Sequence, residues 1–316
     1  MAIFKDYLEN KSPLILHGAL GTEMESLGYD ISGKLWSAKY LLEKPEVIQK
    51  IHETYVAAGA DLITTSSYQA TLPGLIDAEL TEKEAVQIIA LTVQLAKDAR
   101  DKVWATLDDS EKAKRPYPLI SGDVGPYAAY LANGSEYTGD YGQITIKELK
   151  EFHRPRIQIL LDHGVDLLAL ETIPNHLEAQ ALTELLAEEF PEAEAYISFT
   201  VQEPGTISDG TSLDEIAQLV GQSDQILALG INCSSPLLYN QALTILKNAG
   251  KALITYPNSG EVYDGSTQTW KPKDKDALTL VEHSKDWHAQ FGVKILGGCC
   301  RTRPNDIKAL YAEFRT

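Results

Sequence analysis

Cysteine is scarce in this chain, which has only Cys233, Cys299 and Cys300 among its 316 residues. An odd number of cysteines, two of them adjacent, does not fit the paired framework of a disulfide-stabilised secreted domain. The pattern fits a reducing compartment better, with thiols that serve metal binding or thiol chemistry. We therefore expect a cytoplasmic protein.

Basic residues and long apolar runs are also in short supply. The chain has 28 Lys and Arg residues and 45 Asp and Glu residues. The resulting net charge of -17 opposes binding to nucleic-acid phosphates or anionic lipid. The longest apolar runs are far shorter than a membrane span, and residues 1–10 lack the apolar core of a signal peptide. We expect neither nucleic acid nor membrane as a partner.

A G-x-G-x-x-G motif is missing after the first apolar segment, which weakens the case for a dinucleotide-binding sheet. The chain contains a series of short apolar segments, and this pattern predicts buried strands. The eight segments are residues 14–19, 61–66, 119–122, 166–171, 195–200, 226–233, 252–256 and 294–298. Each ends in small or polar residues.

Helix-period stretches lie between these strands. Residues 45–58 begin with a proline, and residues 81–100 and 145–163 each begin with a Thr-x-x-Glu capping box. Strand and helix alternate eight times, which favours a closed (β/α)8 TIM barrel over an open sheet. No composition break marks a boundary, so we expect residues 1–316 to form a single domain. The Gly- and Tyr-rich residues 125–142 predict a lid or pocket wall.

The three cysteines follow two of the predicted strands, at the position that forms the catalytic rim of a parallel barrel. Three converging thiolates can hold Zn²⁺ with its fourth position open, and such a metal deprotonates a substrate thiol. Gly297 and Gly298 would let the adjacent pair turn toward one metal. Buried free thiols and a strained vicinal disulfide are the alternatives.

Other polar and aromatic residues follow the strands. Glu171 ends an apolar run, where a carboxylate is unfavourable without a partner, and an amino-acid ammonium would suit it. Asn232 beside Cys233 either orients a ligand or forms a turn. Trp36 and Tyr68 either line a cage for a cation or pack in the core. His17 stands at the end of the first strand, and the glycines of HGALGT permit either close ligand approach or a tight turn.

Together these residues resemble the homocysteine S-methyltransferase family, particularly its S-methylmethionine-dependent members, over residues 13–312. The motifs that carry the resemblance are HGALGTEME, LWSAKYL, SSYQAT, SGDVGPYAAYLANGSEYTGDY, ALETIPN, GINC, YPNSGEVYD and GGCCRTRP. The resemblance implies a barrel in which Cys233, Cys299 and Cys300 hold zinc and Glu171 holds the homocysteine amine. It also implies that the backbone at Gly18 and Ala19 receives the homocysteine carboxylate and that Trp36 and Tyr68 face the methyl donor.

One residue departs from the family pattern, because His17 stands where the family usually has Asp. A neutral imidazole can accept a hydrogen bond from the substrate ammonium, whereas an imidazolium would repel it. The resemblance implies methyl transfer from S-methylmethionine, or alternatively S-adenosylmethionine, to L-homocysteine, forming methionine. The alternatives are methylation of another thiol or selenol, such as selenocysteine, and a non-catalytic zinc- or thiol-binding protein. Donor preference and oligomeric state are left open.

Overall fold

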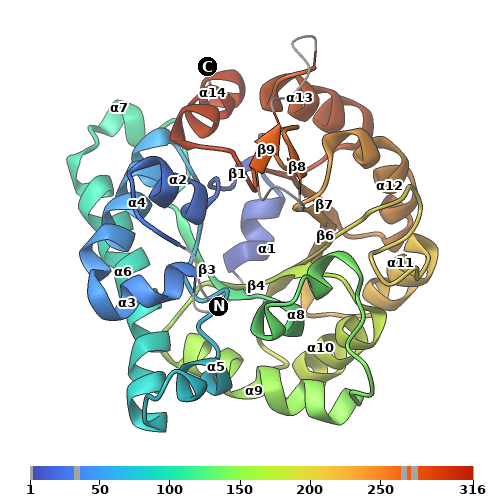
Figure 1. Ribbon diagram of the computed structural model, residues 1–316. Helices are drawn as coiled ribbons and strands as arrows, with labels where there is room; N and C mark the ends of the chain where they lie inside the picture. Colours follow the sequence, from blue (N-terminus) through green and yellow to red (C-terminus); the bar gives the residue numbers. More distant parts are fainter. Residues whose placement is uncertain (1–2, 32–35, 265–268, 272–276, 316) are drawn as a thin grey trace.

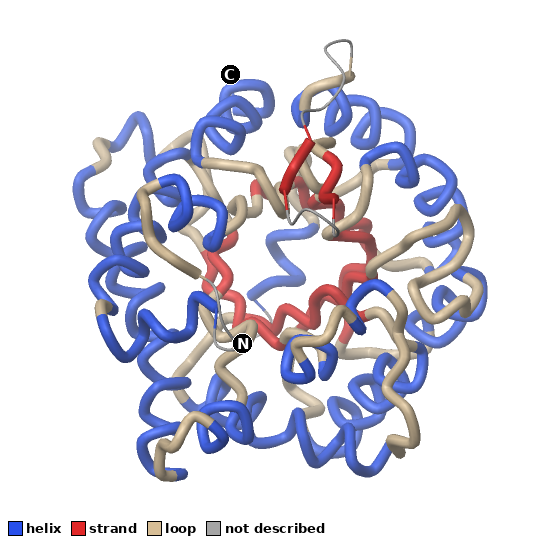
Figure 2. The backbone as a smooth tube through the Cα atoms, in the orientation of Figure 1, coloured by secondary structure: helices blue, strands red, loops and turns tan. Residues whose placement is uncertain are grey.

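The computed structural model describes residues 3–31, 36–264, 269–271 and 277–315 (Figure 1). Eight parallel strands form one sheet in the order β1-β10-β7-β6-β5-β4-β3-β2. A bridge between Leu16 and Leu62 joins the two edges, so the sheet closes into a barrel. Figure 2 shows the ring of strands with the helices outside it. The predicted (β/α)8 TIM barrel is confirmed.

All eight predicted strands are present, most of them one to three residues shorter or longer than the apolar segments. The barrel strands are β1 Leu14–Ile15, β2 Leu62–Thr64, β3 Leu119–Val124, β4 Leu167–Ile173, β5 Ala195–Phe199, β6 Ile226–Asn232, β7 Ala252–Tyr256 and β10 Ile295–Leu296. A separate antiparallel pair, β8 Val262–Asp264 and β9 Thr269–Lys271, was not predicted.

The helices begin where the capping signals predict them. Thr81 and Glu84 form a capping box on α6, and Thr145 and Glu148 form one on α9. The α-helices are α1 Ile3–Leu8, α2 Leu20–Ser26, α3 Lys39–Glu43, α4 Pro45–Ala58, α5 Leu72–Asp77, α6 Glu82–Thr106, α7 Asp109–Lys112, α8 Tyr127–Leu131, α9 Ile146–Asp162, α10 His176–Glu189, α11 Leu213–Gly221, α12 Tyr239–Leu246, α13 Leu280–Phe291 and α14 Pro304–Arg315. The 3₁₀ helices are η1 Trp36–Ala38, η2 Ser135–Tyr137, η3 Pro236–Leu238 and η4 Lys247–Ala249. Among the described residues, no helix is long and apolar enough to cross a membrane.

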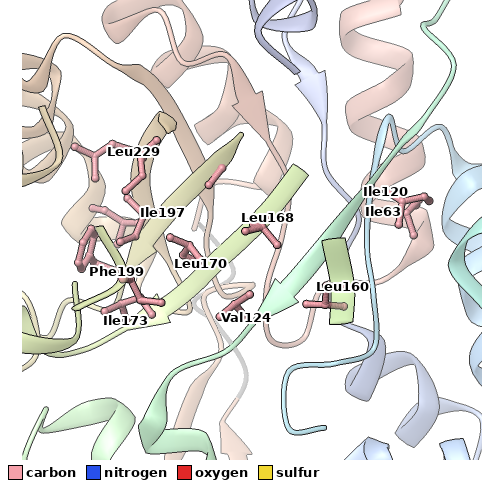
Figure 3. Close-up of a cluster of buried hydrophobic side chains, with 14 of the residues drawn as sticks. Ile63, Ile120, Val124, Leu160, Leu168, Leu170, Ile173, Ile197, Phe199 and Leu229 are labelled. Carbon is pink, nitrogen blue, oxygen red and sulfur yellow. The ribbon is translucent and has the colours of Figure 1, made fainter. Parts of the chain in front are cut away.

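The outer face of the barrel packs against the helices. Figure 3 shows part of this layer, in which Ile120 and Val124 of β3 and Leu168 and Leu170 of β4 lie near Leu160 of α9. Alternation along each strand sends the other residues into the barrel, where a second apolar cluster includes Leu119, Ala169 and Tyr196. The strands are parallel, so their carboxyl ends all open onto one mouth.

The opposite mouth of the barrel is closed by helix α1. Phe4 is fully buried and belongs to the same cluster as Leu14, Leu62 and Leu119 at the beginnings of their strands. The Glu194 carboxylate accepts the backbone N–H of Phe4 at 2.7 Å and holds the helix in place. Figure 1 shows α1 within the ring of strands.

Candidate metal and substrate site

The three thiols converge at the carboxyl mouth of the barrel. Cys233 follows β6, and Cys299 and Cys300 follow β10, with β7 between these strands. The three Sγ atoms lie within 4.8 Å of one another, and those of Cys233 and Cys300 are 3.7 Å apart. Two thiolates on a tetrahedral zinc, with Zn–S bonds of about 2.3 Å, would be about 3.8 Å apart. The Cys233–Cys300 separation therefore matches that of two thiolates on one zinc ion.

The backbone turns that aim the thiols are held by the end of β7. The Cys233 N–H donates to the Tyr256 carbonyl at 3.3 Å, and the Cys299 N–H donates to the Pro257 carbonyl at 2.7 Å. Cys233 has φ of +48°, an uncommon conformation for a residue other than glycine. Hydrogen bonds from the Cys233 and Cys299 thiols hold the pKa of Cys300 well below its usual range. One sulfur of the cluster is thus readily a thiolate.

The two glycines before the cysteine pair are needed for close packing. A Cβ atom at Gly297 would lie 2.7 Å from the Leu16 Cβ, and one at Gly298 would lie 2.4 Å from the Thr302 Oγ1. Neither position has room for a side chain. This close approach brings the cysteine pair against the end of β1.

Glu171 lies at the same mouth, on the barrel side of β4. Its Oε2 accepts a hydrogen bond from the Tyr256 hydroxyl at 3.1 Å, and burial raises its pKa to about 7. A second buried acid, Asp123 of β3, donates a hydrogen bond to the Glu171 carboxyl. Sequence reasoning missed Asp123, although an acid in an apolar strand is the same signal that identified Glu171.

Asn232 fixes the end of β4. Its Oδ1 accepts the Thr172 N–H at 3.0 Å and its Nδ2 donates to the Thr172 Oγ1 at 2.8 Å. Both halves of the amide are occupied, and Asn232 is 1% exposed. Thr172 has φ of +63°, and this pair of hydrogen bonds holds the unusual turn directly after Glu171. The structure thus places Asn232 where it positions Glu171.

His17, Gly18 and Ala19 lie at the end of β1. The His17 Nδ1–H donates to the Gly18 carbonyl at 2.5 Å, and burial lowers the pKa of His17 to about 4. The imidazole is therefore neutral near neutral pH. The Tyr55 hydroxyl donates to the Ala19 carbonyl at 3.0 Å, and the Ala19 N–H donates to the Thr302 carbonyl at 3.3 Å.

The predicted loop of residues 125–142 contains two short helices, α8 and η2, and forms a wall of the site. The prediction of a loop was wrong for these two short helices. Helix α8 forms because Ala128 and Ala129 are buried and give it an apolar face. Tyr137 of η2 and Cys233 line a cavity of about 390 Å³, together with Asn258 and Glu261. This volume is within the range of small-molecule sites.

Of the two aromatic residues expected to face a donor, Tyr68 lies in the site region. Tyr68 packs against Gly125, where a Cβ atom would lie 2.6 Å from the Tyr68 Cδ2. Its hydroxyl forms a hydrogen bond with Thr172, next to Glu171. Trp36 begins η1, but its side chain lies outside the described part of the structure.

The fold and the site together define the class of this protein. It is a TIM-barrel protein whose three thiols, at the carboxyl mouth, form a site suited to a metal ion. Residues 14–314 match the family described as homocysteine S-methyltransferase, and the chain belongs to this methyltransferase family. The homocysteine S-methyltransferase YbgG of Bacillus subtilis (strain 168) is 45% identical over 305 residues, 96% of this chain and 95% of the relative.

Two further comparisons bear on the chemistry of the family. The metallated form of the homocysteine methyltransferase MmuM from Escherichia coli has a TM-score of 0.85 at 40% identity, with 98% of this chain and 99% of that chain covered. The selenocysteine methyltransferase of Astragalus bisulcatus is 39% identical over 311 residues, 94% of this chain and 91% of the relative.

Proposed function

We propose that this protein transfers a methyl group from S-methylmethionine to L-homocysteine with the help of zinc, forming methionine. The observation that carries the proposal is the cluster of Cys233, Cys299 and Cys300, whose spacing fits a tetrahedral zinc. Family membership and the metallated structure of the related Escherichia coli enzyme support it. The free thiols also suit a reducing compartment, the cytoplasm.

The three cysteines would hold the zinc, which when bound lowers the pKa of the substrate thiol so that a thiolate is available at neutral pH. We assign the substrate ammonium to Glu171, which the Tyr256 hydroxyl and the Asn232–Thr172 pair hold in place. The Gly18 N–H would receive the substrate carboxylate, because the Ala19 N–H, which we also expected there, donates to the Thr302 carbonyl. His17 is neutral there and does not repel the ammonium.

The reaction is a direct displacement. The homocysteine sulfur forms a bond to the methyl carbon, the bond from that carbon to the sulfonium sulfur breaks, and the sulfonium sulfur keeps the electron pair. The thiol proton goes to solvent, so no further base is needed. Trp36, Tyr68 and the cavity wall at Tyr137 would position the donor, and positioning supplies most of the acceleration, because the positive charge of the donor disappears during the reaction.

The second candidate function is methylation of a selenol such as selenocysteine on the same scaffold. The related selenocysteine methyltransferase favours it. S-Adenosylmethionine is the alternative methyl donor, and a non-catalytic zinc- or thiol-binding protein is the alternative outside catalysis. We propose small molecules as the partners of this site and a single barrel domain over residues 1–316.

A donor and acceptor panel tests the proposal. Homocysteine or selenocysteine is mixed with S-methylmethionine or S-adenosylmethionine, and the bound zinc is measured in the same preparation. We expect about one zinc per chain and methionine formation from homocysteine and S-methylmethionine. Faster methylation of selenocysteine would favour the second candidate. Bound zinc without methyl transfer from any donor would show a binding protein.

A further inference from the structure

Asp123 is a buried acid inside the barrel that the proposed mechanism does not use. It lies on the inner face of β3 and pairs in register with Ala169, two residues before Glu171 on β4. Its side chain is buried, with the residue 4% exposed, and it is hydrogen-bonded to the Glu171 carboxyl. Its Oδ1 atom has no hydrogen-bond partner among the described residues. A buried carboxyl oxygen without a partner is unfavourable, so a ligand group that donates a hydrogen bond to this oxygen would be stabilised there.

Asp61 offers a comparison with Asp123 within the same molecule. Asp61 is equally buried, but its Oδ2 accepts from the Ile15 N–H at 2.9 Å and from Arg315 at 2.6 Å. Its Oδ1, like that of Asp123, has no hydrogen bond among the described residues, but it is paired with the Arg115 Nε at 3.6 Å. Asp61 thus has two arginines in direct ion pairs, whereas Asp123 has no ion pair among the described residues.

The cation whose charge acts on Asp123, Arg156, forms no ion pair with it among the described residues. Arg156 attracts the Asp123 carboxyl, but its NH groups donate to the carbonyls of Tyr68 at 3.0 Å and Gly125 at 2.5 Å. Burial raises the pKa of Asp123 well above its usual range, so the Asp123–Glu171 pair holds a proton in place of a cation.

The end of β1 offers no negative charge to a cation at this place. The His17 ring is neutral, and its Nδ1–H is used by the Gly18 carbonyl. The pair of acids on β3 and β4 therefore supplies negative charge on the barrel side of the mouth, next to the thiol cluster.

We propose that Asp123 is the second carboxylate of the substrate-ammonium site, so that Asp123 and Glu171 together hold the amino group of the thiol substrate. The inference rests on the proposed function and deepens it. When the ammonium enters, the proton between the two acids leaves to solvent and each carboxylate accepts an N–H from the ammonium.

The test compares two ligands that differ only in the amino group. Binding of L-homocysteine and of 4-mercaptobutanoate, which has the same thiol and carboxylate but no amine, is measured by calorimetry on zinc-loaded protein. The variants are Asp123→Asn, Glu171→Gln and the control Ser121→Ala, one inner position earlier on β3. The Ser121 hydroxyl bonds to Ile63 and Thr64 of β2 and to Tyr196 of β5, and not to either acid.

We expect Asp123→Asn to weaken homocysteine binding about ten-fold to a hundred-fold, the effect of losing one charge-assisted hydrogen bond. Binding of 4-mercaptobutanoate should remain unchanged, and Ser121→Ala should bind both ligands as the unsubstituted protein does. Equal weakening for both ligands would show that Asp123 only supports the structure. Unchanged homocysteine binding would remove Asp123 from the site.

Failure of the proposed function has a different signature, because the unsubstituted protein would then not bind homocysteine or would bind it independently of Glu171. Should Asp123→Asn not fold, difference infrared spectroscopy on the unsubstituted protein gives the answer. The carbonyl stretch of the protonated acid should disappear with homocysteine and persist with 4-mercaptobutanoate. Its persistence with both ligands would overturn the proposal.

Discussion

At the scale of single residues, the end of β7 organises both halves of the site. The Tyr256 and Pro257 carbonyls receive the N–H groups of Cys233 and Cys299, which follow the strands on either side. The Tyr256 side chain also donates to Glu171. A single strand end therefore sets the distance between the proposed metal ligands and the carboxylate proposed to hold the substrate.

Replacing any one of the three cysteines with serine should remove both zinc and methyl transfer. A serine hydroxyl is a poor ligand for zinc, and two thiolates cannot retain the metal as three do. Atomic absorption on the purified variants measures the metal, and circular dichroism checks that the barrel has folded. A zinc-free preparation with full activity would contradict the proposed mechanism.

Glu171→Gln should weaken homocysteine binding while zinc binding is retained. The lost charge-assisted hydrogen bond is worth about 1.5 to 3 kcal/mol, or about ten-fold to a hundred-fold in affinity. Calorimetric titration with homocysteine, together with a zinc measurement, checks the two effects separately. Unchanged affinity would move the ammonium to another residue.

The pH dependence of binding should follow Glu171 and not His17. Burial raises the pKa of Glu171 to about 7, so its negative charge, and with it homocysteine affinity, is lost as the pH falls through that value. His17, with a pKa of about 4, stays neutral over the same range. The acid-side loss should therefore persist in His17→Asn, measured between about pH 5.5 and 8. If His17→Asn abolished this loss, the imidazole would be the titrating group.

Sequence reasoning located the residues of the site whose chemistry is out of place in an apolar strand, namely the three cysteines and Glu171. The contacts of those residues could not be predicted in the same way. The Tyr256–Glu171 and Asn232–Thr172 pairs join positions 85 and 60 residues apart, and only the register of neighbouring strands brings them together. The neutrality of His17 likewise results from burial, which a sequence does not show.

At the scale of elements, alternation of buried strands and capped helices was sufficient to predict the barrel. The structure of residues 125–142 was not predicted, because α8 and η2 are each too short for a clear helical period. Their anchor is a buried acid on another helix. Glu178 of α10 accepts from the Tyr127 N–H at 2.6 Å, the Tyr141 hydroxyl at 2.5 Å and the His153 Nε2 at 2.8 Å.

Tyr141→Phe should loosen this wall of the cavity. The variant loses a hydrogen bond to a buried carboxyl, worth about 1.5 to 3 kcal/mol, and the donor KM should rise while zinc content is unchanged. Hydrogen exchange in residues 127–141 measures the loosening directly. Tyr130→Phe is the control, because its hydroxyl bonds to the exposed Asp77 at 3.0 Å. Equal exchange in both variants would mean that Glu178 does not anchor the wall.

At the scale of the whole molecule, a buried ion cluster ties the last helix to the first strand. Asp61 bonds to the Ile15 N–H of β1 and to Arg315 of α14, and Arg315 also donates to the Pro13 carbonyl at 2.9 Å. The Arg115 guanidinium lies on the other side of the same carboxylate. This cluster joins the two edges of the sheet where the barrel closes.

Asp61→Asn should lower the free energy of unfolding by about 3 to 5 kcal/mol, because two arginines would lose their buried counter-charge. Asp166→Asn is a matched control. Asp166 also accepts an N–H from the preceding strand, from Ile120 at 2.7 Å, but its side chain is 22% exposed and its arginine lies at 3.5 Å. Denaturant unfolding of both variants should show a clearly smaller loss for Asp166→Asn. Similar losses would mean that the N–H bond, and not the ion cluster, carries the effect.

Helix α1, with Phe4 packed into the barrel, closes the end at which the strands begin. The carboxyl mouth is then the route to the site. Both reactants must enter, and both products must leave, through the mouth that carries the thiols. The proposed binding position of the acceptor, at Glu171, lies on the inner wall of the barrel. Tyr137 and Glu261 line the cavity at the mouth. We therefore expect ordered binding, in which the acceptor binds before the donor and the methylated acceptor leaves last. A donor that binds first would block access of the acceptor to Glu171. We therefore expect a large excess of donor to lower the reaction rate.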